Sequence, residues 1–216
     1  MEELNLSMLE RIERSGVVAI VRLDDYTHAP EMATALAEGG IEAIEFTYTN
    51  PAAGEAVRAT KAALGDRMLV GAGTVLDPET ARTAILLGSD FIVTPTVQVE
   101  TIRLCHRYSV PTVIGAFTPT EILTAWEAGA TIVKVFPASV GGPRYLKDVR
   151  GPLPQVRLMP TGGVSLENAG DFIAAGAVGI AAGSNLVDQA TVEKQDWATL
   201  TERARVLVGA VQRARS

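Results

Sequence analysis

The chain has 216 residues, a hydrophobic fraction of 47%, a net charge of −6 and one cysteine, Cys105, which excludes an intramolecular disulfide. No long basic run is present, so the electrostatic footprint of a nucleic-acid-binding protein is missing. No apolar run reaches the roughly 18 residues of a transmembrane helix, and the acidic start Met1–Leu6 lacks the apolar stretch of a signal peptide. We expect a cytoplasmic protein that binds neither nucleic acid nor membrane.

Short apolar segments alternate with helical segments along the whole chain. The predicted strands are Val17–Arg22, Ala43–Thr47, Met68–Gly73, Phe91–Thr94, Thr112–Gly115, Ile132–Phe136, Val156–Pro160 and Val178–Ala181. Helical spacing of apolar residues predicts helices at Pro30–Glu38, Pro51–Leu64, Pro78–Leu87, Thr120–Ala128 and Leu166–Ala175, with a leading helix in residues 1–15 and a closing helix in residues 189–214. Strands that alternate with helices indicate parallel βαβ units.

Glycine and proline mark the expected helix boundaries. Helix stops are predicted at Gly39-Gly40, Gly88, Gly129 and Gly176, because glycine accepts the left-handed conformation just past a helix end. A capping residue followed by proline is a helix start, and this pair occurs at Asn50-Pro51, Asp77-Pro78 and Thr118-Pro119.

Eight strand–helix units in 216 residues average 216/8 = 27 residues each. This spacing suits an α/β fold, a (β/α)₈ TIM barrel with an extra N-terminal helix. No linker or low-complexity segment interrupts the pattern, so residues 1–216 are expected to form one domain. An open doubly wound sheet is the competing architecture, but no nucleotide-binding fingerprint supports it.

Lys134 is the most informative residue of the sequence. It lies within the otherwise apolar predicted strand Ile132–Phe136. Burial disfavours the charged form of an amine and lowers its pKa, and a neutral lysine is a nucleophile that forms Schiff bases. The alternative interpretation is a lysine at a strand end that reaches solvent or pairs with a carboxylate.

Glu45 is a second charged residue inside an apolar strand, Ala43–Thr47. A buried carboxylate is unfavourable unless it is paired or used in chemistry. A structural ion pair with Lys134 is one interpretation, and a general acid/base with a raised pKa is the other. The occurrence of two such groups in one predicted barrel favours the catalytic interpretation.

Two glycine-containing loops follow the seventh and eighth predicted strands, where barrels of this type frequently bind phosphate. Glycines let backbone N–H groups approach an anion. One Gly-Gly pair is an ordinary turn, but two such loops on consecutive strand ends predict a phosphate site. The expected residues of this site are Gly162, Gly163, Gly183 and Ser184.

Other polar or small residues lie at the predicted carboxyl ends of strands, where catalytic groups of a barrel gather. Among them are Phe136 and Thr161. The glycines of Gly71–Thr74 have two interpretations: they make room for layers of barrel side chains, or they open space beside Lys134, with Thr74 donating to a substrate carboxylate. Arg22 suits bidentate recognition of a carboxylate or phosphate. No metal site is expected, because the chain has two histidines and one cysteine without ligand spacing.

Together these residues resemble the 2-keto-3-deoxy-6-phosphogluconate (KDPG) aldolase family, which includes bifunctional 4-hydroxy-2-oxoglutarate (KHG) aldolases. The resemblance runs almost end to end and in the same order. Its segments are Gly39–Thr47, Val70–Val75, Phe91–Pro95, Thr118–Glu121, Val133–Ala138, Pro160–Val164 and Gly183-Ser184.

The resemblance implies a class I aldolase that acts on a phosphorylated 2-keto acid, needs no cofactor and forms a homotrimer. Lys134 matches the Schiff-base lysine and Glu45 matches the acid/base residue. Thr74 and Pro95 match positions of the substrate pocket, and Arg22 matches an arginine of some branches. Gly162, Gly163 and Ser184 match residues of the family's phosphate-binding site.

Two positions depart from the family pattern. One branch carries an arginine four residues after the glutamate, where this chain has Thr49, so carboxylate binding is expected to shift to Arg22 and Thr74. Ile114 precedes Gly115 where Pro-Gly is usual, and is expected to reshape the pocket slightly. The alternatives are an aldolase for the galactonate epimer, a phosphate-binding isomerase or epimerase, and a non-catalytic sugar-phosphate-binding protein.

Overall fold

The computed structural model describes residues 2–216, with side chains from Met8 onward. Its strands are β1 (Val17–Val21), β2 (Ala43–Thr47), β3 (Leu69–Gly73), β4 (Phe91–Val93), β5 (Thr112–Ala116), β6 (Ile132–Val135), β7 (Leu158–Pro160) and β8 (Ile180–Ala182). All pairings are parallel, in the order β7-β6-β5-β4-β3-β2-β1-β8. A bridge from Thr161 to Ala181 joins the two ends of this sheet. The nearly closed barrel confirms the predicted fold class.

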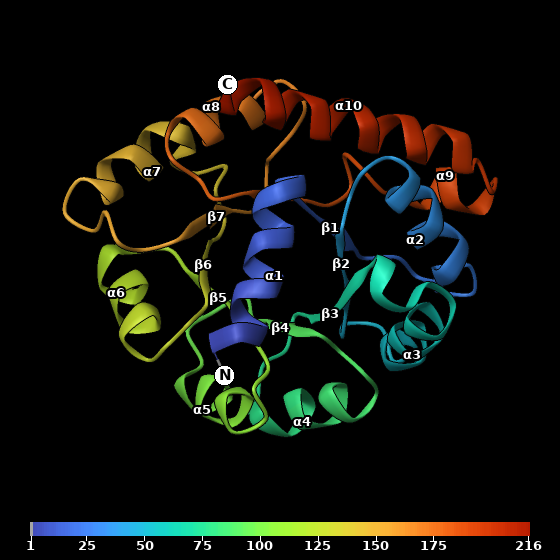
Figure 1. Cartoon of the computed structure of the whole chain (residues 1–216), viewed down its shortest axis with the longest axis horizontal. Coiled ribbons are helices and arrows are strands. Elements are labelled where there is room, and N and C mark those ends of the chain that lie inside the picture. The colour runs from blue at the N-terminus through green and yellow to red at the C-terminus, as the bar shows by residue number, and fades with distance from the viewer. Residues whose placement is uncertain (1) are drawn as a thin grey trace.

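Helices surround the barrel (Figure 1). They are α2 (Ala29–Glu38), α3 (Ala53–Leu64), α4 (Pro78–Leu86), α5 (Val99–Arg107), α6 (Pro119–Glu127), α7 (Gly142–Arg150), α8 (Ala169–Ala174), α9 (Gln189–Glu193) and α10 (Trp197–Arg215), with a 3₁₀ turn at Gly65–Arg67. None of the helices in residues 2–216 has the length and apolarity needed to span a membrane.

The leading helix α1 (Glu2–Ser15) lies across one end of the barrel (Figure 1). The first residue of the predicted range lies outside the described residues. Met8 and Ile12 of this helix are buried with Val18 and Phe91 of the barrel interior. Because α1 leads directly into β1, it closes the amino ends of the strands. The carboxyl ends are left as the mouth.

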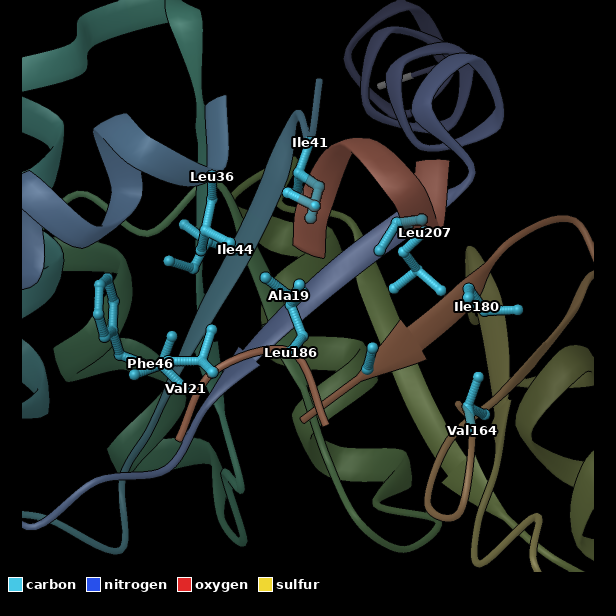
Figure 2. Close-up of a cluster of buried hydrophobic side chains, with 14 of the residues drawn as sticks. Ala19, Val21, Leu36, Ile41, Ile44, Phe46, Val164, Ile180, Leu186 and Leu207 are labelled. Atoms are coloured by element: carbon cyan, nitrogen blue, oxygen red, sulfur yellow. The ribbon is translucent and has the colours of Figure 1, made fainter. Parts of the chain in front are cut away.

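The two faces of the strands have different roles. Side chains alternate between the faces, and Figure 2 shows Ile44 and Phe46 of β2 in the layer between sheet and helices with Leu36 of α2. Glu45, between them in sequence, therefore faces the barrel interior. Ile114 is buried in the helix-facing core, so the expectation that it reshapes the pocket is wrong.

Several helix boundaries follow the sequence signals. Gly40, Gly88, Gly129 and Gly176 have φ of +94°, +96°, +99° and +96°, as expected for helix stops. The side chain of Asp77 accepts a hydrogen bond from the Thr80 N–H at the start of α4. A reciprocal capping box forms between Thr118 and Glu121 at the start of α6.

Other boundaries were predicted wrongly. The Asn50-Pro51 start is wrong, because Asn50 accepts from the Ala52 N–H in a turn and α3 begins at Ala53. The segment 189–214 is two helices, separated where Gln195 adopts φ +52° and Asp196 caps α10. α8 is shorter than predicted and begins at Ala169, because Asn168 accepts from the Ser165 N–H in the preceding turn. β7 and β8 each begin two residues later in the sequence than predicted.

Candidate active site

Lys134 lies on β6, paired with Gly115 of β5 and Met159 of β7. Its side chain is buried, with 5% exposure. Burial lowers the pKa of the Lys134 amine; Glu45 opposes this shift and Arg22 adds to it. Among residues 8–216 no ion pair includes Lys134. Neither the exposed nor the ion-paired interpretation of this lysine therefore holds, and an amine with a lowered pKa remains.

Glu45 is buried on β2, with 2% exposure. Burial raises the pKa of its carboxyl group, while Lys134 and Arg22 lower it. The carboxyl group packs against Gly73, where an added Cβ would lie 3.0 Å from Glu45 Cδ. A Cβ on Gly71 would lie 2.5 Å from the Phe91 ring. The glycines of β3 therefore make room for Glu45 and Phe91, which favours the first interpretation of this segment, space for barrel side chains, over space beside Lys134.

A cavity of about 350 Å³ opens at the carboxyl ends of β1, β6, β7 and β8. Many of the predicted site residues line it, namely Arg22, Lys134, Phe136, Thr161, Gly162, Gly163, Gly183 and Ser184. Lys134 Nζ lies 5.3 Å from the centroid of the Phe136 ring. The structure therefore brings the candidate nucleophile and both glycine loops into one cavity.

Three predicted site residues, Glu45, Thr74 and Pro95, do not line this cavity. They come from β2 and from the ends of β3 and β4. Thr74 adopts φ +58°, an uncommon conformation for a residue other than glycine. Pro95 packs so closely on β5 that a Cβ on Gly115 would lie 2.2 Å from its carbonyl carbon. The electrostatic effect of Glu45 on the pKa of Lys134 links this side of the mouth to the cavity.

Thr161 lines the cavity and has a buried hydroxyl group without a hydrogen-bond partner among the described residues. The residue has 3% exposure. A buried polar atom without a partner is unfavourable. Thr161 Oγ1 is thus suited to a hydrogen bond with a polar group of a ligand.

The loop after β7 presents backbone N–H groups to a ligand. The carbonyl of Thr161 accepts from the Ala138 N–H at 2.8 Å, and the carbonyl of Gly163 accepts from Asn168 Nδ2 at 2.9 Å. Because C=O and N–H point in opposite directions across a trans peptide, the N–H groups of Gly162 and Val164 are directed away from these partners. Within residues 2–216 neither N–H group has a protein acceptor, so both are free for an anion.

The glycines of this loop are required by its geometry. Gly162 and Gly163 have φ of +84° and +76°. A Cβ on Gly163 would lie 2.6 Å from Ser139 Cβ, and one on Gly162 would lie 3.3 Å from the Phe136 ring. Only glycine combines this conformation with so close an approach.

The loop after β8 is fixed in a similar way. The carbonyl of Gly183 accepts from the N–H groups of Leu186 and Val187, at 2.8 and 2.9 Å. The peptide N–H of Ser184 therefore points away from these donors and has no acceptor in the described part of the chain. With the exposed Ser184 hydroxyl beside it, the loop adds donors to the same cavity.

The model of the family described as KDPG and KHG aldolase matches residues 8–203. The chain belongs to this aldolase family. It is 36% identical over 190 residues to 2-dehydro-3-deoxy-phosphogluconate aldolase of Pseudomonas aeruginosa, which covers 88% of this chain and 86% of that protein. It is 37% identical over 171 residues to 2-dehydro-3-deoxy-6-phosphogalactonate aldolase of Escherichia coli K12, and this match covers 79% of this chain and 83% of that protein.

A solved aldolase of the same family has the same fold. KDPG aldolase from Legionella pneumophila, with pyruvate captured at low pH as a covalent carbinolamine intermediate, matches with a TM-score of 0.82 at 27% identity. The match covers 88% of this chain and 93% of that structure.

Some residues of this aldolase's cavity were not predicted from the sequence. They are Ile20, Ala181 and Val187, whereas Val164 and Asn185, which also line the cavity, end the two loops of the predicted phosphate site. The alternation of faces along β1 and β8 is a signal that could have found Ile20 and Ala181. Asn185 directly follows Gly183-Ser184, but its contact with Val164 has no signal in the sequence. Residues 8–216 contain no cluster of three or more His, Cys, Asp or Glu side chains able to hold a metal.

Proposed function

We propose that this chain is a single-domain class I aldolase that cleaves KDPG to pyruvate and glyceraldehyde 3-phosphate. Lys134 is the Schiff-base nucleophile and Glu45 is the general acid/base. The observation that carries the proposal is the buried Lys134 amine, with its lowered pKa and no ion pair within residues 8–216, in a cavity that also holds two loops of free N–H groups. The family resemblance also leads us to propose a cytoplasmic homotrimer.

The first half of the reaction makes an electron sink. The neutral Nζ of Lys134 attacks the C2 ketone, and the carbinolamine takes up one proton from solvent and loses water to give a protonated imine. The imine is cationic, so the Glu45 carboxylate, which favours positive charge on Lys134, also stabilises this intermediate.

The second half breaks the carbon–carbon bond. Glu45 takes the C4 hydroxyl proton, directly or through water, as the C3–C4 electron pair moves into the imine. Glyceraldehyde 3-phosphate leaves, and the enamine accepts a proton at C3 from Glu45. Water then hydrolyses the imine, which releases pyruvate and restores the Lys134 amine.

The anionic ends of the substrate are held away from the bond that breaks. We assign the phosphate to the two loops that contain Gly162, Gly163 and Ser184, through the free N–H groups of Gly162, Val164 and Ser184, and the carboxylate to Arg22 and Thr74. Binding energy from such remote groups positions the reacting atoms. Arg22 is available for this role, because within residues 8–216 no hydrogen bond or ion pair occupies its guanidinium.

The substrate assignment is tested by a parallel assay of pyruvate release from KDPG, its galactonate epimer and 4-hydroxy-2-oxoglutarate. We expect a higher kcat/KM for the two sugar acids than for 4-hydroxy-2-oxoglutarate, because only they carry the phosphate that the loops bind, and the family resemblance leads us to expect KDPG above its epimer. A higher kcat/KM for the epimer would show that the galactonate sugar acid, not KDPG, is the preferred substrate. No pyruvate from any of the three would contradict the aldolase assignment.

Thr161→Val gives a further expected result. Valine has nearly the size of threonine but lacks the hydroxyl group, so a substrate hydroxyl would lose its partner. We expect kcat/KM for KDPG to fall by about tenfold to a hundredfold, whereas the melting temperature is unchanged or higher, because Oγ1 is unsatisfied without ligand. Thermal unfolding and steady-state kinetics measure both. Unchanged kcat/KM would remove Thr161 from the substrate site.

A further inference from the structure

The two phosphate-binding loops are joined by one side chain. Asn185, in the loop after β8, donates from Nδ2 to the carbonyl of Val164 in the loop after β7, at 2.9 Å. No other side-chain hydrogen bond in the described chain connects residues 161–168 with residues 183–188.

The Val164 peptide is fixed from both sides. Its carbonyl accepts from Asn185, and the N–H of the same peptide, on Ser165, donates to Asn168 Oδ1 at 2.8 Å. Because the peptide is planar, fixing its two polar groups also fixes the orientation of the preceding turn. The free N–H groups of Gly162 and Val164 belong to that turn.

Val164 of one loop and Leu186 of the other are buried in the helix-facing core, with 3% and 1% exposure, but the packing behind the loops is incomplete. A second cavity, of about 370 Å³, lies between the loops and α10, with Leu166, Leu186, Val206 and Leu207 among its lining residues. Val164 and Asn185 line both this cavity and the substrate cavity, and Figure 2 shows Val164 and Leu186 on the two loops. The Asn185–Val164 hydrogen bond is therefore part of the wall between two open spaces.

We propose that Asn185 is a positioning residue for the substrate phosphate. Its amide holds the loop after β7 against the loop after β8, so that the N–H groups of Gly162, Val164 and Ser184 converge on one anion. The buried side chains of Val164 and Leu186 anchor each loop to the core, whereas the Asn185 amide joins one loop to the other. The inference rests on the proposed function, since it requires a phosphorylated substrate in this cavity.

The test compares Asn185→Ala with Gln212→Ala. Gln212 is a matched control, because its amide also donates to a distant carbonyl, that of Arg14, but it lies on α10 at the α1 end of the barrel. We expect Asn185→Ala to raise KM for KDPG about tenfold, the size of one lost hydrogen bond, with kcat within about twofold. Exchange of the pyruvate methyl protons in D₂O, which needs no phosphate, should stay at the wild-type rate.

Hydrogen exchange of the ligand-free enzyme separates positioning from direct contact. We expect amides of residues 161–168 to exchange faster in Asn185→Ala than in the wild type and in Gln212→Ala. A higher KM with unchanged exchange would make Asn185 a direct phosphate ligand and overturn the proposal. So would an unchanged KM, or an equal loss of KDPG cleavage and pyruvate exchange. If the wild type itself released no pyruvate, the proposed function would fail first.

Discussion

Lys134→Arg is expected to lose KDPG cleavage by at least about a thousandfold, although it keeps a cation at the same position. A guanidinium stays protonated and cannot form an imine, whereas burial lowers the pKa of the Lys134 amine and makes its neutral form accessible. The substitution thus separates the nucleophile from the charge. If Lys134 acted only as an electrostatic clamp, as in an isomerase, arginine would retain much of the activity.

Trapping of the imine gives the direct measurement. Borohydride reduction in the presence of pyruvate should attach one pyruvate-derived group to the wild-type chain, and mass spectrometry of peptides should place it on Lys134. Lys61→Arg is the matched control, because Lys61 is bound to Asp90 at 2.9 Å in an ion pair that arginine can also make. We expect that variant to retain both cleavage and the adduct on Lys134. An adduct on another lysine, with full activity of Lys134→Arg, would refute the assignment.

The chemical groups of the site were predictable because they violate local patterns. Lys134 and Glu45 stand in strands whose other residues are apolar, and the structure buries both. The glycine stops were predictable for a similar reason, since a left-handed residue after a helix favours glycine. Such signals are local, so a single sequence contains them.

The features that were not predicted from the sequence depend on contacts between segments that are distant in the chain. Gly73 is next to Glu45 only after β2 and β3 pair, and nothing in Gly71–Thr74 alone says which side chain needs the space. Asn50 looked like a helix cap, but its amide donates to the carbonyls of Leu23 and Asp24 in another loop. The hydrogen bond from Asn185 to the Val164 carbonyl was missed because the two residues are 21 positions apart in the sequence. Element types are local properties, whereas these contacts are tertiary.

Glu45→Gln is expected to slow cleavage by about a hundredfold to ten-thousandfold, the usual contribution of a general base. Glutamine keeps the size of the side chain beside Gly73 but cannot take the C4 hydroxyl proton. The Schiff base should still form, because Lys134 loses only the carboxylate that favours its charged form. Borohydride trapping with pyruvate should therefore remain positive in a variant that cleaves poorly, which separates imine formation from carbon–carbon cleavage.

The pH dependence of this variant tests the role of Glu45 more sharply. Burial raises the pKa of Glu45 above its ordinary value of 4.5, so wild-type kcat should fall as the pH drops through that raised pKa. This fall of kcat in acid should be absent from Glu45→Gln.

The pKa of Glu45 also affects stability. A carboxyl group whose pKa is raised in the folded state stabilises the protein below its ordinary pKa, and this stabilisation is lost as the pH rises through the raised value. Above the raised pKa the ionised carboxylate is therefore a cost that glutamine removes, and the melting temperature should exceed that of the wild type there and approach it in acid. A wild-type acid limb that persists in Glu45→Gln would assign the titration, and the proton transfer, to another group.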